Sequence, residues 1–153
     1  RLKFIDAVRI AKPDVVFAHE AYNDYNPDHD MVGYLAFIAR INATIKLIET
    51  AYPPAPKVPA LFNYSTLAFA KFIPEYYVDI TDTWETKKKM FLCHDSQQGD
   101  WCRDAFGVNY VDMMESEAKL AATQAGTPGC THAEVFKLCK SWPTIAGAYK
   151  LLP

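Results

Sequence analysis

The spacing of apolar residues predicts that helices and strands alternate along the first part of the chain. Residues 1–11 place apolar side chains near helical spacing and end at Lys12-Pro13, which predicts an amphipathic helix. Residues 14–18 form a short apolar run that contains two valines, which is typical of a buried parallel strand. A long helix ending before Tyr52-Pro53 is predicted from the spacing of Met31, Leu35, Ile38, Ile41, Ile45 and Ile48.

The second part of the chain continues the alternation. Strands are predicted at residues 58–64 and 76–80, and helices at residues 84–96, 115–124 and 133–140. Thr81 or Asp82 is in position to cap the first of these helices. This order of elements predicts a single layered α/β domain over residues 1–153. Ligands of such sheets bind beyond the carboxyl ends of the strands, where the polar loop 19–29 would lie.

Composition and charge exclude several classes of protein. The 153 residues are 50% hydrophobic and 22% charged with a net charge of −2, as in ordinary globular proteins. The longest apolar stretch, residues 31–39, has about half of the roughly 20 residues that a membrane span needs, so no span is expected. The basic run 87–89 is better explained as a solvated helix face, so no nucleic-acid partner is expected. No signal peptide is visible, which favours a cytoplasmic protein.

The most polar segment of the chain, residues 19–29, follows the first predicted strand. His29 lies just before the long helix, where a neutral imidazole can bind a metal ion while Asp28 orients it. The alternative is an ordinary helix N-terminus in which Asp28 is the cap and His29 is exposed. The residues alone favour this second interpretation, because isolated histidines are seldom metal ligands.

Other polar residues are candidates for contact with a ligand. His19 directly follows the predicted strand, and either lines a pocket or is an ordinary polar residue at a strand exit. Asp24 is expected to form a turn, and Tyr25 either stacks on a ligand or anchors the loop. His94 lies at the end of a predicted helix, where the helix dipole favours histidine whatever its function.

Four segments, in order along nearly the whole chain, resemble the LmbE/PIG-L-type deacetylase superfamily. They are Lys-Pro-Asp-Val-Val-Phe-Ala-His (12–19), Asn-Asp-Tyr-Asn-Pro-Asp-His (23–29), Val-Asp-Ile (78–80) with the later His-Asp-Ser-Gln (94–97), and His-Ala-Glu-Val-Phe (132–136). The resemblance implies a Rossmann-like layered sheet with helices on both faces, of which this chain would be the C-terminal part.

The resemblance also implies a zinc-dependent carbohydrate amide deacetylase. One of the three zinc ligands would correspond to His29, and an upstream A-H-P-D-D motif would supply the other two and the general base. Such a site leaves room for a zinc-activated water, which attacks the amide carbonyl. The implied substrate is an N-acyl amino sugar or glycoconjugate, similar to N-acetylglucosamine. His19, Asp24 and Tyr25 would then bind the substrate, and Asp28 would orient its neighbours.

Two departures from the family pattern bear on activity. No H-P-D-D occurs in the chain, which begins at Arg1 within a predicted helix. We therefore expect a truncated or cleaved polypeptide that is inactive by itself. In addition, Asn26 stands where many relatives have a histidine thought to stabilise the oxyanion or carry a proton. Asn26 can donate a hydrogen bond but cannot act as an acid, so His94 becomes the proton-donor candidate by analogy.

Two further hypotheses remain open at this level. A non-catalytic or degenerate sugar-binding or scaffold relative of the same family is favoured by Asn26 and by the missing motif. A nucleotide-binding domain comes last, because the chain contains no glycine-rich phosphate-binding motif. Relatives often assemble into oligomers, so a homo-oligomer is compatible with the resemblance.

Overall fold

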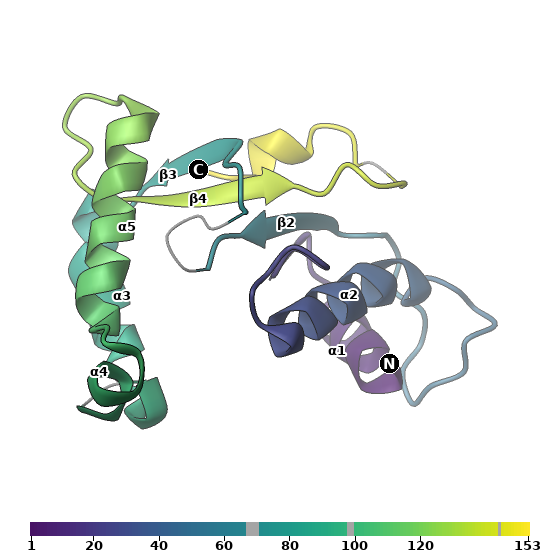
Figure 1. Cartoon of the computed structure of the whole chain (residues 1–153). Coiled ribbons are helices and arrows are strands. Elements are labelled where there is room, and N and C mark those ends of the chain that lie inside the picture. The colour runs from purple at the N-terminus through teal and green to yellow at the C-terminus, as the bar shows by residue number, and fades with distance from the viewer. Residues whose placement is uncertain (67–70, 98–99, 144) are drawn as a thin grey trace. The chain divides into compact units, whose positions relative to one another are not determined.

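The computed structural model of the chain describes residues 1–66, 71–97, 100–143 and 145–153. Its helices and strands (Figure 1) are α1 (Leu2–Ala11), β1 (Val15–Ala18), α2 (Pro27–Asn42), β2 (Ala60–Tyr64), β3 (Tyr76–Asp79), α3 (Trp84–Phe91), α4 (Asp100–Phe106), α5 (Tyr110–Ala125) and β4 (Ala133–Leu138). Short 3₁₀ turns cover Thr81–Thr83, Asp95–Gln97 and Ala148–Leu151. None of the described helices is long and apolar enough to cross a membrane.

The four strands form one mixed sheet in the order β1-β2-β4-β3. β1 is parallel to β2, with Val15 opposite Ala60, whereas β4 is antiparallel to β2, with Leu138 opposite Phe62. The chain has two compact units, whose described residues are 1–66, 71–75, 136–143 and 145–153 in the first and 76–97 and 100–135 in the second. The prediction of an α/β fold is confirmed.

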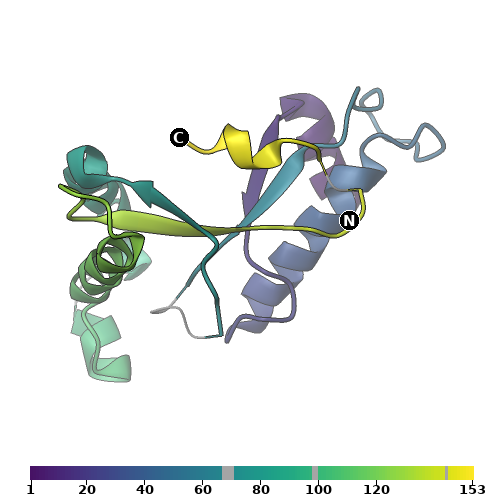
Figure 2. The ribbon, with the colours of Figure 1, turned by 90° about the horizontal axis from the view of Figure 1, so that it is seen from above.

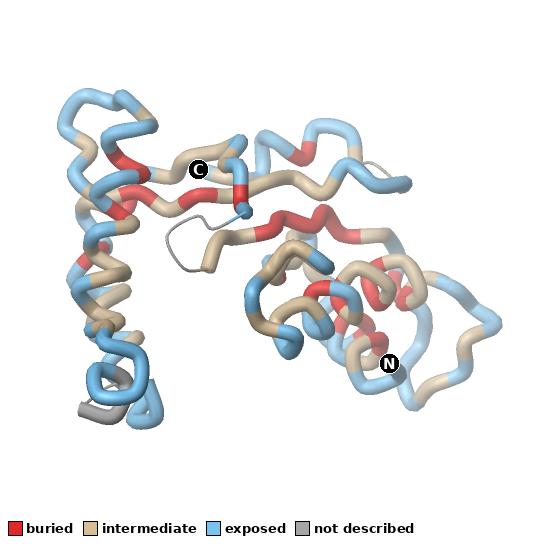
Figure 3. Tube along the Cα trace, viewed as in Figure 1, coloured by how far each residue is buried: buried red, intermediate tan, exposed pale blue. Residues whose placement is uncertain are grey.

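Small residues let α2 pack closely on the parallel strands of the first unit. Ala36 of α2 is buried with Ala18 of β1 and Leu61 of β2, and α2 lies alongside both strands (Figure 2). β2 is buried over most of its length, as Figure 3 shows. One turn further along α2, Ala39 packs against Ile5 of α1. The buried face of α2 is therefore made of Gly33, Ala36, Ala39 and Arg40, and the predicted face that begins at Met31, now 55% exposed, is wrong.

The core of the second unit forms where α3 and α5 meet. Trp84 and Ile80 are buried with Ala118 of α5. The ring of Trp84 stacks on that of His132, with centroids 4.6 Å apart and planes 10° from parallel. Lys87 of the basic run forms an ion pair with Glu134 at 2.6 Å. This lysine is therefore paired within the unit.

Several predicted elements and boundaries are wrong. Residues 133–140 were expected to be a helix, but Ala133–Leu138 is strand β4, because Ala133 and Val135 alternate into the core at strand spacing. The long helix starts earlier than predicted, at Pro27, and ends earlier, at Asn42. α3 ends at Phe91 and not near residue 96. α4 was not predicted, and α5 begins at Tyr110, where Asn109 caps it.

The early end of α2 is explained by a buried arginine. Arg9 of α1 is only 2% exposed and donates hydrogen bonds to the carbonyl oxygens of Ala43 (3.0 Å), Ile45 (3.0 Å) and Tyr52 (2.9 Å). Ala43 and Ile45 lie just beyond the end of α2, and Tyr52 lies ten residues beyond it. The guanidinium therefore replaces the helical hydrogen bonds and turns the chain back over α1.

We expect Arg9→Lys to lower the free energy of unfolding by about 2–3 kcal/mol, because an ammonium cannot reach all three carbonyls and leaves buried acceptors unpaired. Urea denaturation of the full-length protein measures the loss. Lys3→Met changes an exposed cation on the same helix and should have little effect. Equal stability of Arg9→Lys and the wild type would contradict this account.

Candidate functional site

The site lies at the carboxyl ends of the two parallel strands of the first unit. His19 follows β1 directly, and Thr66 lies two residues beyond the end of β2. Because β1 and β2 are parallel, their ends meet at the same edge of the sheet. His29 joins them from the first turn of α2. Three segments that are distant in the sequence thus supply the side chains of one site.

The backbone of His19 is held from two sides. Asn63 of β2 donates a hydrogen bond from its side chain to the His19 carbonyl oxygen at 2.9 Å. On the other side lies Gly33 of α2, where an added Cβ would lie 2.5 Å from that oxygen and 3.0 Å from the Ala21 nitrogen. Only glycine allows α2 to approach this closely. The strand exit and the helix that carries His29 are therefore in direct contact.

The loop between β1 and α2 is closed by short polar side chains. Asn26 is the N-cap of α2, and its side chain accepts a hydrogen bond from the Asp28 nitrogen at 2.9 Å, with Pro27 in the first turn. Asp24 accepts from the Asn26 nitrogen at 3.0 Å, and Asp30 accepts from the Asp24 nitrogen at 3.1 Å. Asn26 is thus the cap, and the alternative in which Asp28 caps the helix is wrong.

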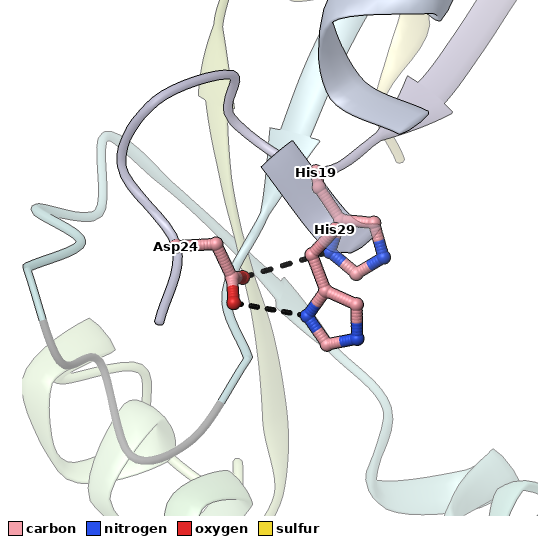
Figure 4. Close-up of side chains that lie close together, drawn as sticks. All are labelled: His19, Asp24 and His29. Atoms are coloured by element: carbon pink, nitrogen blue, oxygen red, sulfur yellow. Dashed lines mark hydrogen bonds and ion pairs between the residues drawn. The ribbon is translucent and has the colours of Figure 1, made fainter. Parts of the chain in front are cut away.

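Two imidazole rings stack beside one carboxylate in this loop. The rings of His19 and His29 have centroids 4.0 Å apart and planes 8° from parallel. Asp24 Oδ1 lies 2.9 Å from His29 Nδ1, and Asp24 Oδ2 lies 3.7 Å from His19 Nδ1. Figure 4 shows that both Nδ1 atoms face Asp24 and that the second nitrogen of each ring points away from it. Side-chain exposure is 14% for His19, 27% for His29 and 8% for Asp24.

Asp24 is stabilised as a carboxylate by the groups around it. Burial alone would raise the pKa of its carboxyl group, but hydrogen bonds from the Thr66 hydroxyl, the Asn26 nitrogen and His29 outweigh burial and lower it. Burial lowers the pKa of His19, and the neighbouring His29 lowers it further. The pKa of Tyr64, whose ring lies 4.8 Å from that of His19, is raised by burial and by the charge of Asp24.

The donor set indicates how a metal ion would fit here. His19, Asp24 and His29 each offer a potential ligand atom, and these atoms lie within 4.8 Å of one another. Imidazole lone pairs lie in the ring plane, so two nearly parallel rings cannot both direct theirs at one ion about 2 Å away. Asp24 already accepts hydrogen bonds on both oxygens. The parallel rings therefore fit a single imidazole ligand, and the carboxylate lies closer to the ring of His29 than to that of His19.

The predicted residues differ in their relation to this cluster. His19, Asp24 and His29 form it, and the ring of Tyr25 meets that of His29 edge-on at 5.6 Å. Asn26 acts locally as a helix cap, and Asp28 is exposed in the first turn of α2. His94 belongs to the second unit, where it is exposed three residues beyond the end of α3.

Sequence reasoning missed two residues of the site. Tyr64 packs on His19, and the Thr66 hydroxyl donates a hydrogen bond to Asp24 Oδ2. Both lie at the carboxyl end of β2. Because parallel strands end at the same edge, the predicted strand 58–64 already indicated that the residues following it belong beside His19.

A cavity of about 330 Å³ lies beside the same loop in the first unit. Tyr22, Tyr34 and Phe37 line it with aromatic rings, and Glu20 and Lys137 form an ion pair in its wall. The three residues of the His-Asp-His cluster are not among its lining residues. The cavity size falls at the lower end of the range for small-molecule pockets.

Comparison with known proteins supports the fold assignment. No protein-family model matches the chain. It is similar to 4-oxalmesaconate hydratase of Pseudomonas putida, with 27% identity over 104 residues that make up 65% of this chain and 39% of that protein.

Three solved structures are similar to the chain. GalB, the 4-carboxy-2-hydroxymuconate hydratase from Pseudomonas putida KT2440, has a TM-score of 0.67 and 21% identity over 94% of this chain and 58% of its own. N,N'-diacetylchitobiose deacetylase from Pyrococcus horikoshii has a TM-score of 0.70 and 23% identity, covering 90% and 50%. The conserved protein TT1542 from Thermus thermophilus has a TM-score of 0.70 and 25% identity, covering 94% and 58%.

The fold and the cluster define an α/β protein with a polar site at the carboxyl ends of its parallel strands. More specifically, the chain has the LmbE/PIG-L-type fold, which its solved neighbours share. Those neighbours include both a deacetylase and a hydratase. The chain spans about half the length of these structures, and 39% of the hydratase that it matches in sequence.

We expect Gly33→Ala to destabilise the protein by about 1–3 kcal/mol, because the new methyl group would overlap the His19 carbonyl oxygen. Helix propensity alone predicts the opposite sign, a gain of up to about 1 kcal/mol. Urea denaturation distinguishes the two. Ser116→Ala, on the exposed face of α5, is the control and should change stability little. A stabilised Gly33→Ala variant would show that α2 does not need this close approach.

Proposed function

We propose that the full-length protein is a zinc-dependent hydrolase that removes the acyl group from an N-acylated amino sugar. One observation carries the proposal: His29, backed by Asp24, stands at the carboxyl ends of parallel strands in a fold that a diacetylchitobiose deacetylase shares. The proposal has three parts: zinc as the metal, hydrolysis of an amide as the reaction, and an N-acylated amino sugar as the substrate.

His29 would hold the zinc ion through Nε2, since its Nδ1 is occupied by Asp24. Zinc, when bound, supplies a Lewis acid that polarises a carbonyl group and makes water a better nucleophile. The chain's own residues orient the groups around it. Asp24 fixes the His29 ring, Tyr64 and His19 form an aromatic wall, and Asn26 holds the start of α2. Further ligands and the general base would come from an H-P-D-D segment that this chain does not contain.

Substrate contacts are proposed for the exposed side of the loop. Tyr25 is 54% exposed next to His29, where an aromatic ring can pack on the apolar face of a sugar. His19 presents its second ring nitrogen on the same side as His29 (Figure 4). Asp24 is less suited to bind substrate, because it is almost buried and both its oxygens accept hydrogen bonds from the protein. The orienting role expected of Asp28 passes to Asp24, which contacts the His29 ring, because Asp28 is exposed in the first turn of α2. His94 keeps its proposed role as proton donor.

A hydratase is the second candidate, and one observation favours it. A curated relative that matches this chain in sequence, at 27% identity over 104 residues, is a hydratase. Deacetylation and hydration share a requirement, since in both water attacks a carbon made electrophilic by a polarised carbonyl group, directly bonded in the amide and conjugated in the unsaturated acid. The same residues therefore serve either reaction. A non-catalytic sugar-binding relative is the third candidate, which Asn26 and the missing motif favour.

We expect the full-length protein to retain stoichiometric zinc after dialysis, and His29→Ala to weaken zinc binding by at least about 100-fold. Loss of supporting contacts alone costs 10–100-fold, and a direct ligand should cost more. Elemental analysis and zinc competition measure both, and circular dichroism should show an intact fold. Met31→Ala, at an exposed position of the same helix, is the control. Retention of zinc by His29→Ala would remove His29 from the metal site.

The substrate class follows from two parallel assays of the zinc-loaded full-length protein. The deacetylase proposal predicts release of acetate and a free amine from N-acetylated amino sugars, with no change in a conjugated unsaturated tricarboxylate. The hydratase candidate predicts the reverse, seen as loss of ultraviolet absorbance when water adds to the conjugated bond. Zinc binding with neither activity would favour the non-catalytic relative.

A further inference from the structure

Asp24 does more than close the loop between β1 and α2. We infer that Asp24 is a positioning residue that fixes the tautomer and the direction of the His29 ring, so that Nε2 is the nitrogen offered to a ligand. The inference deepens the proposed function, and it rests on that function only for the identity of the ligand as zinc. Its other part, the tautomer, is a property of the metal-free protein.

The tautomer follows from the acceptor character of the carboxylate. Asp24 Oδ1 lies 2.9 Å from His29 Nδ1. An ionised carboxylate has only acceptors, so Nδ1 must carry the hydrogen and donate it. In the neutral ring the lone pair then lies on Nε2. Figure 4 shows this nitrogen on the side of the ring away from Asp24.

The carboxylate is itself fixed in place, which separates this role from direct metal binding. Asp24 Oδ1 also accepts a hydrogen bond from the Asn26 nitrogen at 3.0 Å, and Oδ2 accepts one from the Thr66 hydroxyl. Its side chain is only 8% exposed. To reach a metal ion, Asp24 would have to give up these bonds while remaining almost buried, which leaves donors unpaired. Its contacts therefore favour the role of a support over that of a ligand.

Two of the neighbours of the His29 ring restrict its motion together. The His19 ring, stacked at 4.0 Å and 8°, keeps the His29 ring in its plane. The hydrogen bond to Asp24 opposes a 180° turn about the Cβ–Cγ bond, which would put Cδ2 in the place of Nδ1. The same carboxylate faces His19 Nδ1 at 3.7 Å, so both rings present their second nitrogens on one side. Asp24 thus lies beside the Nδ1 atoms of both rings.

The test reads the imidazole nitrogens of His29 by ¹⁵N NMR in the zinc-free full-length protein, about two pH units above the usual histidine pKa of ~6.5. We expect the wild type to show hydrogen on Nδ1. Asp24→Ala should lose this preference and bind zinc about 10–100-fold more weakly. Asp24→Asn should restore part of both, because its amide oxygen can occupy the place of Oδ1.

The matched control is Asp30→Ala, which removes another carboxylate that braces the same loop through the Asp24 nitrogen. It should leave the His29 tautomer unchanged even if it lowers stability. The inference is overturned if Asp24→Ala leaves the nitrogen shifts as in the wild type, or if Asp30→Ala moves them equally. If Asp24→Ala does not fold, the wild type decides, because hydrogen on Nε2 would refute the assignment.

The failure of this inference can be told apart from the failure of the proposed function. A full-length protein that binds no zinc, yet carries hydrogen on His29 Nδ1 in a manner dependent on Asp24, refutes the zinc enzyme and leaves the positioning role intact. A zinc-binding protein in which Asp24→Ala changes neither tautomer nor affinity refutes the positioning role alone.

Discussion

The parallel pairing of β1 with β2 positions the side chains of the site. Parallel strands end at a common edge, so the residues that follow Ala18 and Tyr64 lie together although more than forty positions separate them. Asn63 reinforces the pairing by donating to the carbonyl at the end of β1. Without this register, the Thr66 hydroxyl would not reach Asp24, and the carboxylate would lose one of the bonds that hold it.

Small side chains and buried arginines hold the helices of the first unit in different ways. Gly33 and Ala36 let α2 lie almost against the strands. Arg9 and Arg40, both at most 2% exposed, donate to backbone carbonyls of irregular segments. A buried guanidinium has five donors and can satisfy several carbonyls at once, so each arginine orders a stretch of chain that lacks regular hydrogen bonds.

Sequence patterns predicted the parts of the fold that depend on local spacing. The first helix, the strand 14–18 and the polar loop 19–29 were expected and were found close to their predicted places, whereas α2 ends about ten residues earlier than expected. β4 was mistaken for a helix, because six residues with apolar positions do not distinguish the two periods when the pairing strand is unknown. The end of α2 depends on Arg9, which is distant in sequence and carries no local signal.

For the candidate site, the residue types were predictable but their arrangement was not. The polar loop after β1 and the histidine before α2 both stood out in the sequence. That Asp24 rather than Asp28 contacts His29 depends on the cap formed by Asn26, which sends the Asp28 side chain to the surface. The contribution of Thr66 depends on tertiary contacts, which a single sequence does not reveal.

The cap at the start of α2 places chemistry and stability in competition at one position. A histidine at position 26 would add a third imidazole ring to the loop, but it would remove the amide oxygen that accepts from the Asp28 nitrogen. Loss of an asparagine cap costs about 1 kcal/mol. In this chain Asn26 caps the helix, and His19 and His29 supply the imidazole rings of the loop. Any lineage that exchanged one residue for the other would have to secure the beginning of the helix by different means.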